Sequence, residues 1–300
     1  MAVKIPYRRE LDFSYGKIEQ IAPLVRRVVA ENPSPFTHFG TGTYILGTGN
    51  VAVIDPGPAD SDHIDALLQG LKNETISHVL VTHTHMDHSP GCALLKEHSD
   101  AKTHAYGPHG AGKLEQGVPV EEGGDMDFVP DQLVRHGDVI EGGDWSVECV
   151  YTPGHTSIHM CYALRETKSL FTGDHVMAWS TSIISPPDGD MTAYLSSLDL
   201  LLKRDDAVYW PTHGPSVIDP KAHVQAFIDH RKERSDQILK CVGEGVELIT
   251  EMVPKMYVDT PEFMYPAAAR SVLAAMEYLV TTGQVVAEGG VKLNSRYRPG

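Results

Sequence analysis

The sequence predicts an α/β fold followed by a small winged-helix-like domain. Over residues 1–221, short apolar runs typical of buried strands alternate with segments of helical spacing. Four of these runs end directly before a loop that carries histidine or aspartate. Over residues 222–300 the pattern changes to helices followed by a terminal hairpin. We therefore expect a larger α/β domain over 1–221 and a smaller domain over 222–300.

The first part of the larger domain is predicted as a hairpin, a helix and a strand. Two apolar runs within 41–54 flank Gly-Thr-Gly-Asn, which predicts the hairpin. Apolar residues at helical spacing predict a helix over 62–71, and the β-rich run 76–81 predicts a buried strand. Ser89 and Pro90 predict the start of the next helix, with the Ser89 hydroxyl as its cap.

Three more strands and one helix are predicted further along the larger domain. The strands are expected over 147–151, 169–172 and 208–210, and an amphipathic helix over 190–204. In the smaller domain, helical spacing precedes a hairpin predicted over 284–293, around a turn at Gly289-Gly290.

Composition narrows the class of function. The 300 residues carry a net charge of −15, and residues 222–300 hold nine Lys/Arg against ten Asp/Glu, so the negative charge lies in 1–221. Such a charge repels polyanions and counts against nucleic acid as a partner. No apolar run approaches the roughly 18 residues of a membrane helix. The N-terminus also lacks the apolar core of an export signal, so we expect a cytoplasmic protein without membrane contact.

Cysteine and histidine differ in what they indicate. The four cysteines form no C-x-x-C pair and are expected to be reduced core thiols: Cys92, Cys149, Cys161 and Cys241. Sixteen histidines are unusual, and four potential metal ligands fall within 83–88. A single histidine is more often a hydrogen-bonded core residue, but burying four such groups unpaired would be costly. This cluster therefore predicts a metal site.

Ligand spacing supports the same prediction. His83 and His85 lie two residues apart, so their rings point the same way in an extended segment and can hold one metal. Asp87 and His88 follow at once and can turn toward a second metal. Imidazole and carboxylate without cysteine are typical of a hydrolytic rather than a structural zinc site.

These residues resemble the metallo-β-lactamase superfamily. Thr82-His83-Thr84-His85-Met86-Asp87-His88 is similar to its H-x-H-x-D-H motif, and 152–156, 172–174 and 212–214 are similar to its next three motifs in order. The resemblance covers roughly the first 220 residues and implies an αββα sandwich. Residues 32–44 and the helices and wing after Pro220 resemble the lactamase-β-like subgroup, which carries a C-terminal winged helix.

The resemblance assigns a role to each motif position. It implies that His83, His85 and His155 hold one zinc ion and that Asp87, His88 and His213 hold a second. Asp174 would bridge the two ions. Asp55, in Ile54-Asp55-Pro56-Gly57, resembles the aspartate that orients a ligand histidine from behind. His159 and His175 are expected to be supporting or core residues.

The expected function is that of a dinuclear zinc-dependent hydrolase that uses a metal-bridging hydroxide. Two zinc ions about 3.5–4 Å apart lower the pKa of a shared water toward 7. Asp87 is expected to accept a proton as a catalytic residue, as superfamily members suggest. Iron and manganese are alternative metals, because the same nitrogen and oxygen ligands suit them.

The substrate class stays open between two alternatives. Superfamily members cleave thioesters, lactones, β-lactams and phosphodiesters, so the fold does not choose among them. The acidic chain favours a small-molecule ester, thioester or lactone. A single-strand endoribonuclease is the alternative, because some subgroup members have that activity. Arg270 is the one basic residue of the expected recognition helix, so a dimerisation or pocket-capping role is favoured over duplex DNA binding.

Overall fold

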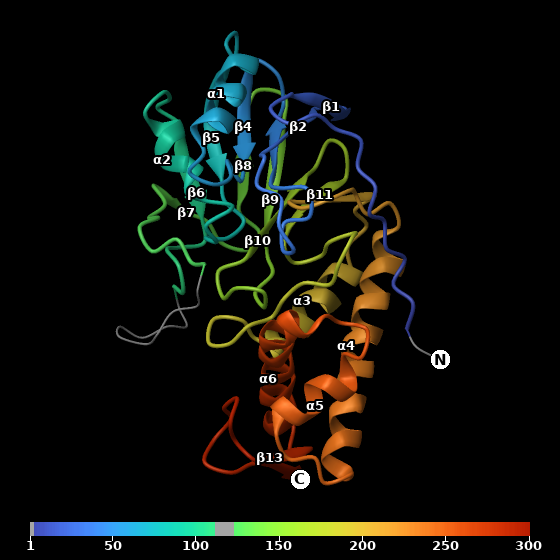
Figure 1. Cartoon of the computed structure of the whole chain (residues 1–300). Helices are drawn as coiled ribbons and strands as arrows, with labels where there is room; N and C mark the ends of the chain where they lie inside the picture. Colours follow the sequence, from blue (N-terminus) through green and yellow to red (C-terminus); the bar gives the residue numbers. More distant parts are fainter. Residues whose placement is uncertain (1–2, 112–122) are drawn as a thin grey trace.

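A computed structural model describes residues 3–111 and 123–300. Two β-sheets stack face to face, helices cover the outer faces, and a helical C-terminal domain lies beyond the second sheet (Figure 1). This is the predicted αββα sandwich with a winged-helix domain.

The first sheet has seven strands in chain order, antiparallel from the first to the fourth and parallel from there on. Its strands are β1 (Glu19–Ala22), β2 (Val25–Val29), β3 (Gly42–Leu46), β4 (Asn50–Ile54), β5 (Thr75–Leu80), β6 (Lys102–Ala105) and β7 (Gln132–Leu133). Helices α1 (Ser61–Gly70) and α2 (Gly91–Lys96) connect its parallel strands. The predicted hairpin, first helix and strand are thus confirmed.

The second sheet has five strands in the order β12-β11-β10-β9-β8, with only β11 and β12 parallel. Its strands are β8 (Val139–Glu141), β9 (Ser146–Tyr151), β10 (Met160–Leu164), β11 (Ser169–Gly173) and β12 (Val208–Pro211). Helix α3 (Met191–Leu202) is the crossover from β11 to β12, and the Asp190 carboxylate caps it. The three predicted strands and the predicted helix are confirmed.

Alternation along each strand explains why the two sheets stack. Tyr44 and Leu46 of β3 face the second sheet and share a core with Tyr162 and Phe171. Ile45, between them in sequence, faces the opposite way, toward α1 and α2. Successive side chains of a strand point to opposite faces, so an apolar strand buried on both sides belongs to the middle of a layered fold. All four cysteines are buried free thiols, as expected.

The C-terminal domain consists of four helical segments and a short hairpin. These are α4 (Pro220–Gly243), α5 (Ile249–Met256), the 3₁₀ turn η1 (Glu262–Met264), α6 (Tyr265–Thr281), β13 (Val285–Ala287) and β14 (Tyr297–Pro299). Helix α4 contributes Val224 and Phe227 to the core beside the second sheet, and Ile238 and Val242 to the core of the C-terminal domain. The domain boundary at 221/222 stays a prediction.

Two local predictions were wrong. The Ser89 hydroxyl donates to the Asp125 carboxylate at 2.6 Å, and no side chain caps α2. The second strand of the terminal hairpin is β14 rather than a strand ending at 293. Tyr297 is fully buried there, whereas Leu293 is exposed. Burial of a large aromatic side chain outweighs the turn preference of Gly289-Gly290.

Candidate metal centre

All four predicted ligand segments meet at one edge of the sandwich. The loop after β5 carries His83, His85, Asp87 and His88. The loop after β9 carries His155, Asp174 directly follows β11, and His213 lies two residues after β12. The structure brings the seven residues into three overlapping groups: His83, His85 and His155; His83, His88 and Asp174; and Asp87, His88 and His213.

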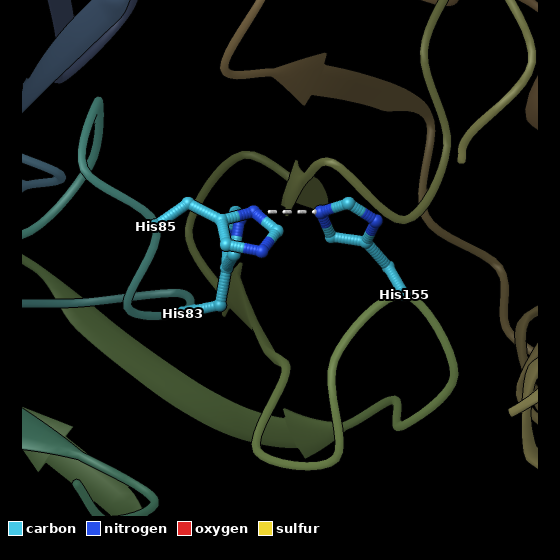
Figure 2. A group of neighbouring side chains, drawn as sticks. All are labelled: His83, His85 and His155. Carbon is cyan, nitrogen blue, oxygen red and sulfur yellow. Dashed lines mark hydrogen bonds between the residues drawn. The ribbon is translucent and has the colours of Figure 1, made fainter. Parts of the chain in front are cut away.

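The first group consists of three imidazoles. His83 Nε2 lies 2.9 Å from His85 Nδ1, which lies 3.2 Å from His155 Nε2. Figure 2 shows His83 and His85 on one side and His155 facing them from a separate loop. Zinc–nitrogen bonds of about 2.0–2.1 Å place tetrahedral ligand atoms roughly 3.3–3.4 Å apart. The spacing of the three nitrogens is therefore close to that of one face of a zinc coordination sphere.

The third group, Asp87, His88 and His213, lies beside the first, and its Asp87 and His88 stand on the same loop as His83 and His85. His213 Nε2 is 3.1 Å and His88 Nε2 is 3.6 Å from Asp87 Oδ2. Asp174 lies between the groups: its Oδ2 is 3.8 Å from His155 Nε2, and its Oδ1 is 3.5 Å from His213 Nε2. A carboxylate in this position has an oxygen available to each group, which is the arrangement that a bridging role requires.

Hydrogen bonds on the far side of three rings leave their Nε2 atoms facing the centre. Nδ1 of His155 donates to Ile183 O at 2.6 Å, and Nδ1 of His213 donates to Gly40 O at 3.1 Å. His88 Nδ1 lies 2.9 Å from the Asp55 carboxylate. Since carbonyl and carboxylate oxygens only accept, each Nδ1 carries the proton and each neutral ring has an unprotonated Nε2. The three Nε2 atoms thus converge on one region, where a bound cation would take the place of any proton on them.

Unsatisfied buried atoms provide the test of fit. His88 Nε2 and Asp174 Oδ1 are buried, and the described residues offer neither a hydrogen-bond partner. The same holds for His85 Nε2. Leaving such groups unpaired costs about 1–3 kcal/mol each. A metal ion would satisfy the first two atoms, so the residues present fit a divalent metal.

The pKa values of the histidines differ between the two parts of the centre: those of His83 and His85 are lowered, and that of His88 is raised. Burial lowers the pKa of His85 to about 3 and the pKa of His83 well below its usual range. Both rings are therefore neutral ligands at physiological pH. Around His88, burial also lowers the pKa, but the carboxylates of Asp87, Asp174 and Asp55 outweigh it and raise the pKa well above normal. This part of the centre favours positive charge.

Asp55 supports the centre from behind. Its carboxylate accepts hydrogen bonds from Thr82 N at 2.8 Å, Thr82 Oγ1 at 2.7 Å and Thr212 Oγ1 at 3.0 Å, besides the contact to His88. The predicted contact with a ligand histidine is therefore present. Asp55 also has a φ of 48°, a left-handed conformation that is uncommon outside glycine.

Thr82 and Thr212 were missed by the sequence prediction. Each directly precedes a candidate ligand histidine, and both donate to the same carboxylate from just beyond strands of different sheets. A Thr-His pair at 82–83 and 212–213 is a weak signal for them, because the same pair also occurs at 37–38, 84–85 and 103–104.

The other histidines near the centre lie outside the three ligand groups. His159 and His175 are fully buried, with ring centroids 5.5 Å apart, as expected of supporting residues. Tyr194 is a core residue and donates to the His175 carbonyl at 2.9 Å. His109 contacts Thr84 Oγ1 at 2.8 Å, one residue from the candidate ligand His85.

Gly154, directly before His155, allows a close approach to α3 and yields a stability prediction. Its φ is 144°, and a Cβ atom there would lie 2.4 Å from Tyr194 Cα. We expect Gly154→Ala to lower the free energy of unfolding by about 2–4 kcal/mol in denaturant titrations. Gly243→Ala is the matched control, because nothing lies within 4 Å of the added methyl group and alanine favours the helix. Equal stability of the two variants would contradict this account.

Family models match both parts of the chain. The model described as "Metallo-beta-lactamase superfamily" matches residues 37–213, and the model described as "Beta-lactamase associated winged helix domain" matches residues 249–292. The first match spans the whole set of candidate ligands.

Individual proteins are also similar. An atrochrysone carboxyl ACP thioesterase from Cryptosporiopsis sp. (strain 8999) is 32% identical over 263 residues, covering 81% of this chain and 74% of the relative. A beta-lactamase-like protein 2 homolog from Caenorhabditis elegans is 29% identical over 273 residues, covering 89% and 88%. A beta-lactamase domain protein from Burkholderia ambifaria superposes with a TM-score of 0.80 at 20% identity, covering 99% and 97%. That last likeness concerns the fold.

Proposed function

The chain belongs to the metallo-β-lactamase superfamily, and from that membership we propose that it is a dinuclear zinc hydrolase of small-molecule thioesters. It is a hydrolase with a histidine and aspartate metal site. The observation that carries the proposal is the convergence of seven ligand side chains from four strand ends.

We assign His83, His85 and His155 to one zinc ion, and Asp87, His88 and His213 to the other, with Asp174 between them. Zinc ions bound there would supply Lewis-acid activation of a carbonyl group and a nucleophilic water at neutral pH. All-nitrogen and mixed nitrogen–oxygen ligand sets suit zinc, and iron and manganese are the alternative occupants.

Asp87 differs from the buried ligands because its side chain is 27% exposed. Burial raises its pKa, but His88 and His213 outweigh that effect and hold the pKa below its usual range. The carboxylate is therefore ionised, as a ligand role requires, and it can accept a hydrogen bond from a substrate or water. We propose Asp87 as the catalytic proton acceptor on the open side of the centre.

Support for the thioester comes from the relatives and from charge. The fungal relative is named as a thioesterase, and esters and lactones share the same acyl carbonyl. The net charge of −15 disfavours a polyanionic substrate. Single-stranded RNA stays the alternative substrate, and it forms the second arm of the assay below.

Metal removal tests the hydrolytic proposal. Dialysis against a chelator should abolish hydrolysis of acyl thioesters, and about two equivalents of zinc should restore it. Elemental analysis before and after dialysis measures the metal content. Full activity in protein shown to be free of metal would contradict the proposal.

A substrate panel separates the two substrate classes. Equal amounts of zinc-loaded protein are incubated with acyl thioesters, lactones and single-stranded RNA at physiological salt. We expect thioester turnover to be the fastest. RNA cleavage without turnover of any small acyl compound would replace the thioester proposal by the endoribonuclease.

Two accompanying proposals concern assembly and location. Val258 and Phe263 of the C-terminal domain are each 73% exposed, which supports homo-oligomer formation through that domain. Sedimentation of wild type against a Phe263→Ser variant checks this.

Among the described residues, no helix combines the length and apolarity needed to cross a membrane. We propose a cytoplasmic location, which fractionation of cells tests.

A further inference from the structure

Helix α4 sends two buried polar side chains toward the segment that links Asp174 to α3. His223 Nε2 donates to Met177 O at 2.9 Å. Two turns further along, Arg231 Nη2 donates to Ser182 O. Both acceptors are backbone carbonyls of residues 175–190, so a helix that begins the C-terminal domain binds a loop of the metal-bearing domain.

Arg231 is unusual because it is only 7% exposed and the part of the chain that the structure describes offers it no carboxylate partner. Among the described residues no ion pair with it is formed, and its guanidinium carbon lies 5.1 Å from the Tyr194 ring centroid. Burying a charge is costly unless it is paired and hydrogen-bonded. A neutral side chain would fill this space at lower cost, so the charge has to be explained by what it binds.

The backbone segment that Arg231 binds also contacts His155, one of the predicted metal ligands. The carbonyl that accepts from Arg231 belongs to Ser182, and the next carbonyl, of Ile183, accepts from His155 Nδ1 at 2.6 Å. The Ser182 hydroxyl donates to His175 O at 2.7 Å, which ties the same stretch to the residue after Asp174. The dipeptide Ser182–Ile183 thus accepts from Arg231 of α4 through its first carbonyl and from His155 through its second.

We propose that Arg231 is a positioning residue for the metal centre, acting through the Ser182–Ile183 backbone on His155. The inference rests on the metal-binding part of the proposed function and extends it to the C-terminal domain. By fixing Ser182, Arg231 places the Ile183 carbonyl where it keeps the proton on His155 Nδ1. His155 Nε2 then stays unprotonated and directed at His83 and His85.

The proposal also gives the C-terminal domain a role in metal binding. The hydrogen-bond partner of a ligand histidine sets its tautomer and orientation, and loss of such a partner typically costs about 10–100-fold in metal affinity. A domain that holds this partner in place affects the centre without contacting a metal or a substrate.

The test compares two arginines of the same helix. Arg231→Met keeps an unbranched apolar side chain but removes the guanidinium group that lies near the Tyr194 ring and donates to Ser182. Arg234→Met is the matched control, because Arg234 binds Met256 O and Gln237 Oε1, and its guanidinium carbon lies 4.4 Å from the Tyr257 ring centroid, all within the C-terminal domain. Zinc is titrated into metal-free protein by calorimetry, and cobalt spectra report the coordination of each site.

We expect one of the two zinc sites of Arg231→Met to bind about 10–100-fold more weakly, while Arg234→Met matches wild type. A lower melting temperature with unchanged zinc affinity and cobalt spectra would show a merely structural role and overturn the proposal. If Arg231→Met does not fold, Arg231→Gln decides by the same criteria, since its shorter side chain ends before the Ser182 oxygen. Wild type that binds no zinc would instead refute the metal centre itself.

Discussion

An Asp174→Ala variant is expected to lose thioester hydrolysis by on the order of 10³-fold in kcat/KM. Asp174 lies within 3.8 Å of ring nitrogens from both ligand groups. Its removal takes away the carboxylate that is positioned to hold two ions together. Loss of the Lewis-acid contribution, about 4 kcal/mol, corresponds to that change in rate. Steady-state kinetics and elemental analysis of the purified variant measure both effects, and we expect at most one ion per chain.

The matched control is Asp205→Ala. Asp205 pairs with Lys168 at 2.7 Å on the surface, and its side chain is 83% exposed. Surface ion pairs contribute little, so this variant should retain two ions and wild-type kinetics within a factor of about two. Two tightly bound ions and full activity in Asp174→Ala would exclude the bridging role.

Replacing Asp55 by asparagine is expected to lower the free energy of unfolding by about 3–5 kcal/mol. Asp55 is fully buried and accepts from two backbone or hydroxyl groups of Thr82, from Thr212 and from His88. An amide of the same shape offers one acceptor oxygen and places an NH₂ group against donors. Denaturant unfolding of the metal-free protein measures the loss, which then does not depend on bound ions.

Thr212→Val provides the graded comparison for Asp55→Asn. It removes one donor to the same carboxylate with little change in shape, so we expect a loss of about 1–2 kcal/mol. Zinc affinity should follow the same order, because only the Asp55 change releases the proton position of His88. Equal losses of stability in the two variants would mean that Asp55 does not organise the site.

Most elements of the larger domain could be predicted from local pattern. The hairpin β3–β4 follows from Gly-Thr-Gly-Asn between two apolar runs, and α1 follows from its helical spacing. Ser89 shows the limit of local rules, because its hydroxyl binds Asp125, which is 36 residues away in sequence. The terminal hairpin shows the same limit, since burial of Tyr297 decides which segment pairs with β13.

The candidate ligands could also be predicted from the sequence, because histidine and aspartate at fixed spacing after strands indicate metal chemistry. Their supporting contacts were readable only in part. Asp55 was predicted from its motif, whereas the threonines that bind it were not. Nothing in the sequence indicated a role for Arg231, since a single arginine in a helix is normally a solvated surface residue.

The sequence alone determined which side chains are the candidate ligands and which strand ends present them, because residue type and short-range periodicity are local properties. The tertiary structure decided how those ligands are held. Residues far apart in sequence, such as Asp55 with Thr212 and Arg231 with Ser182, meet only when two sheets and α4 pack together. Asp55 and the Ser182–Ile183 backbone, held by those contacts, in turn accept from Nδ1 of His88 and of His155. The orientation of each ring therefore depends on neighbours in space rather than on neighbours in the chain.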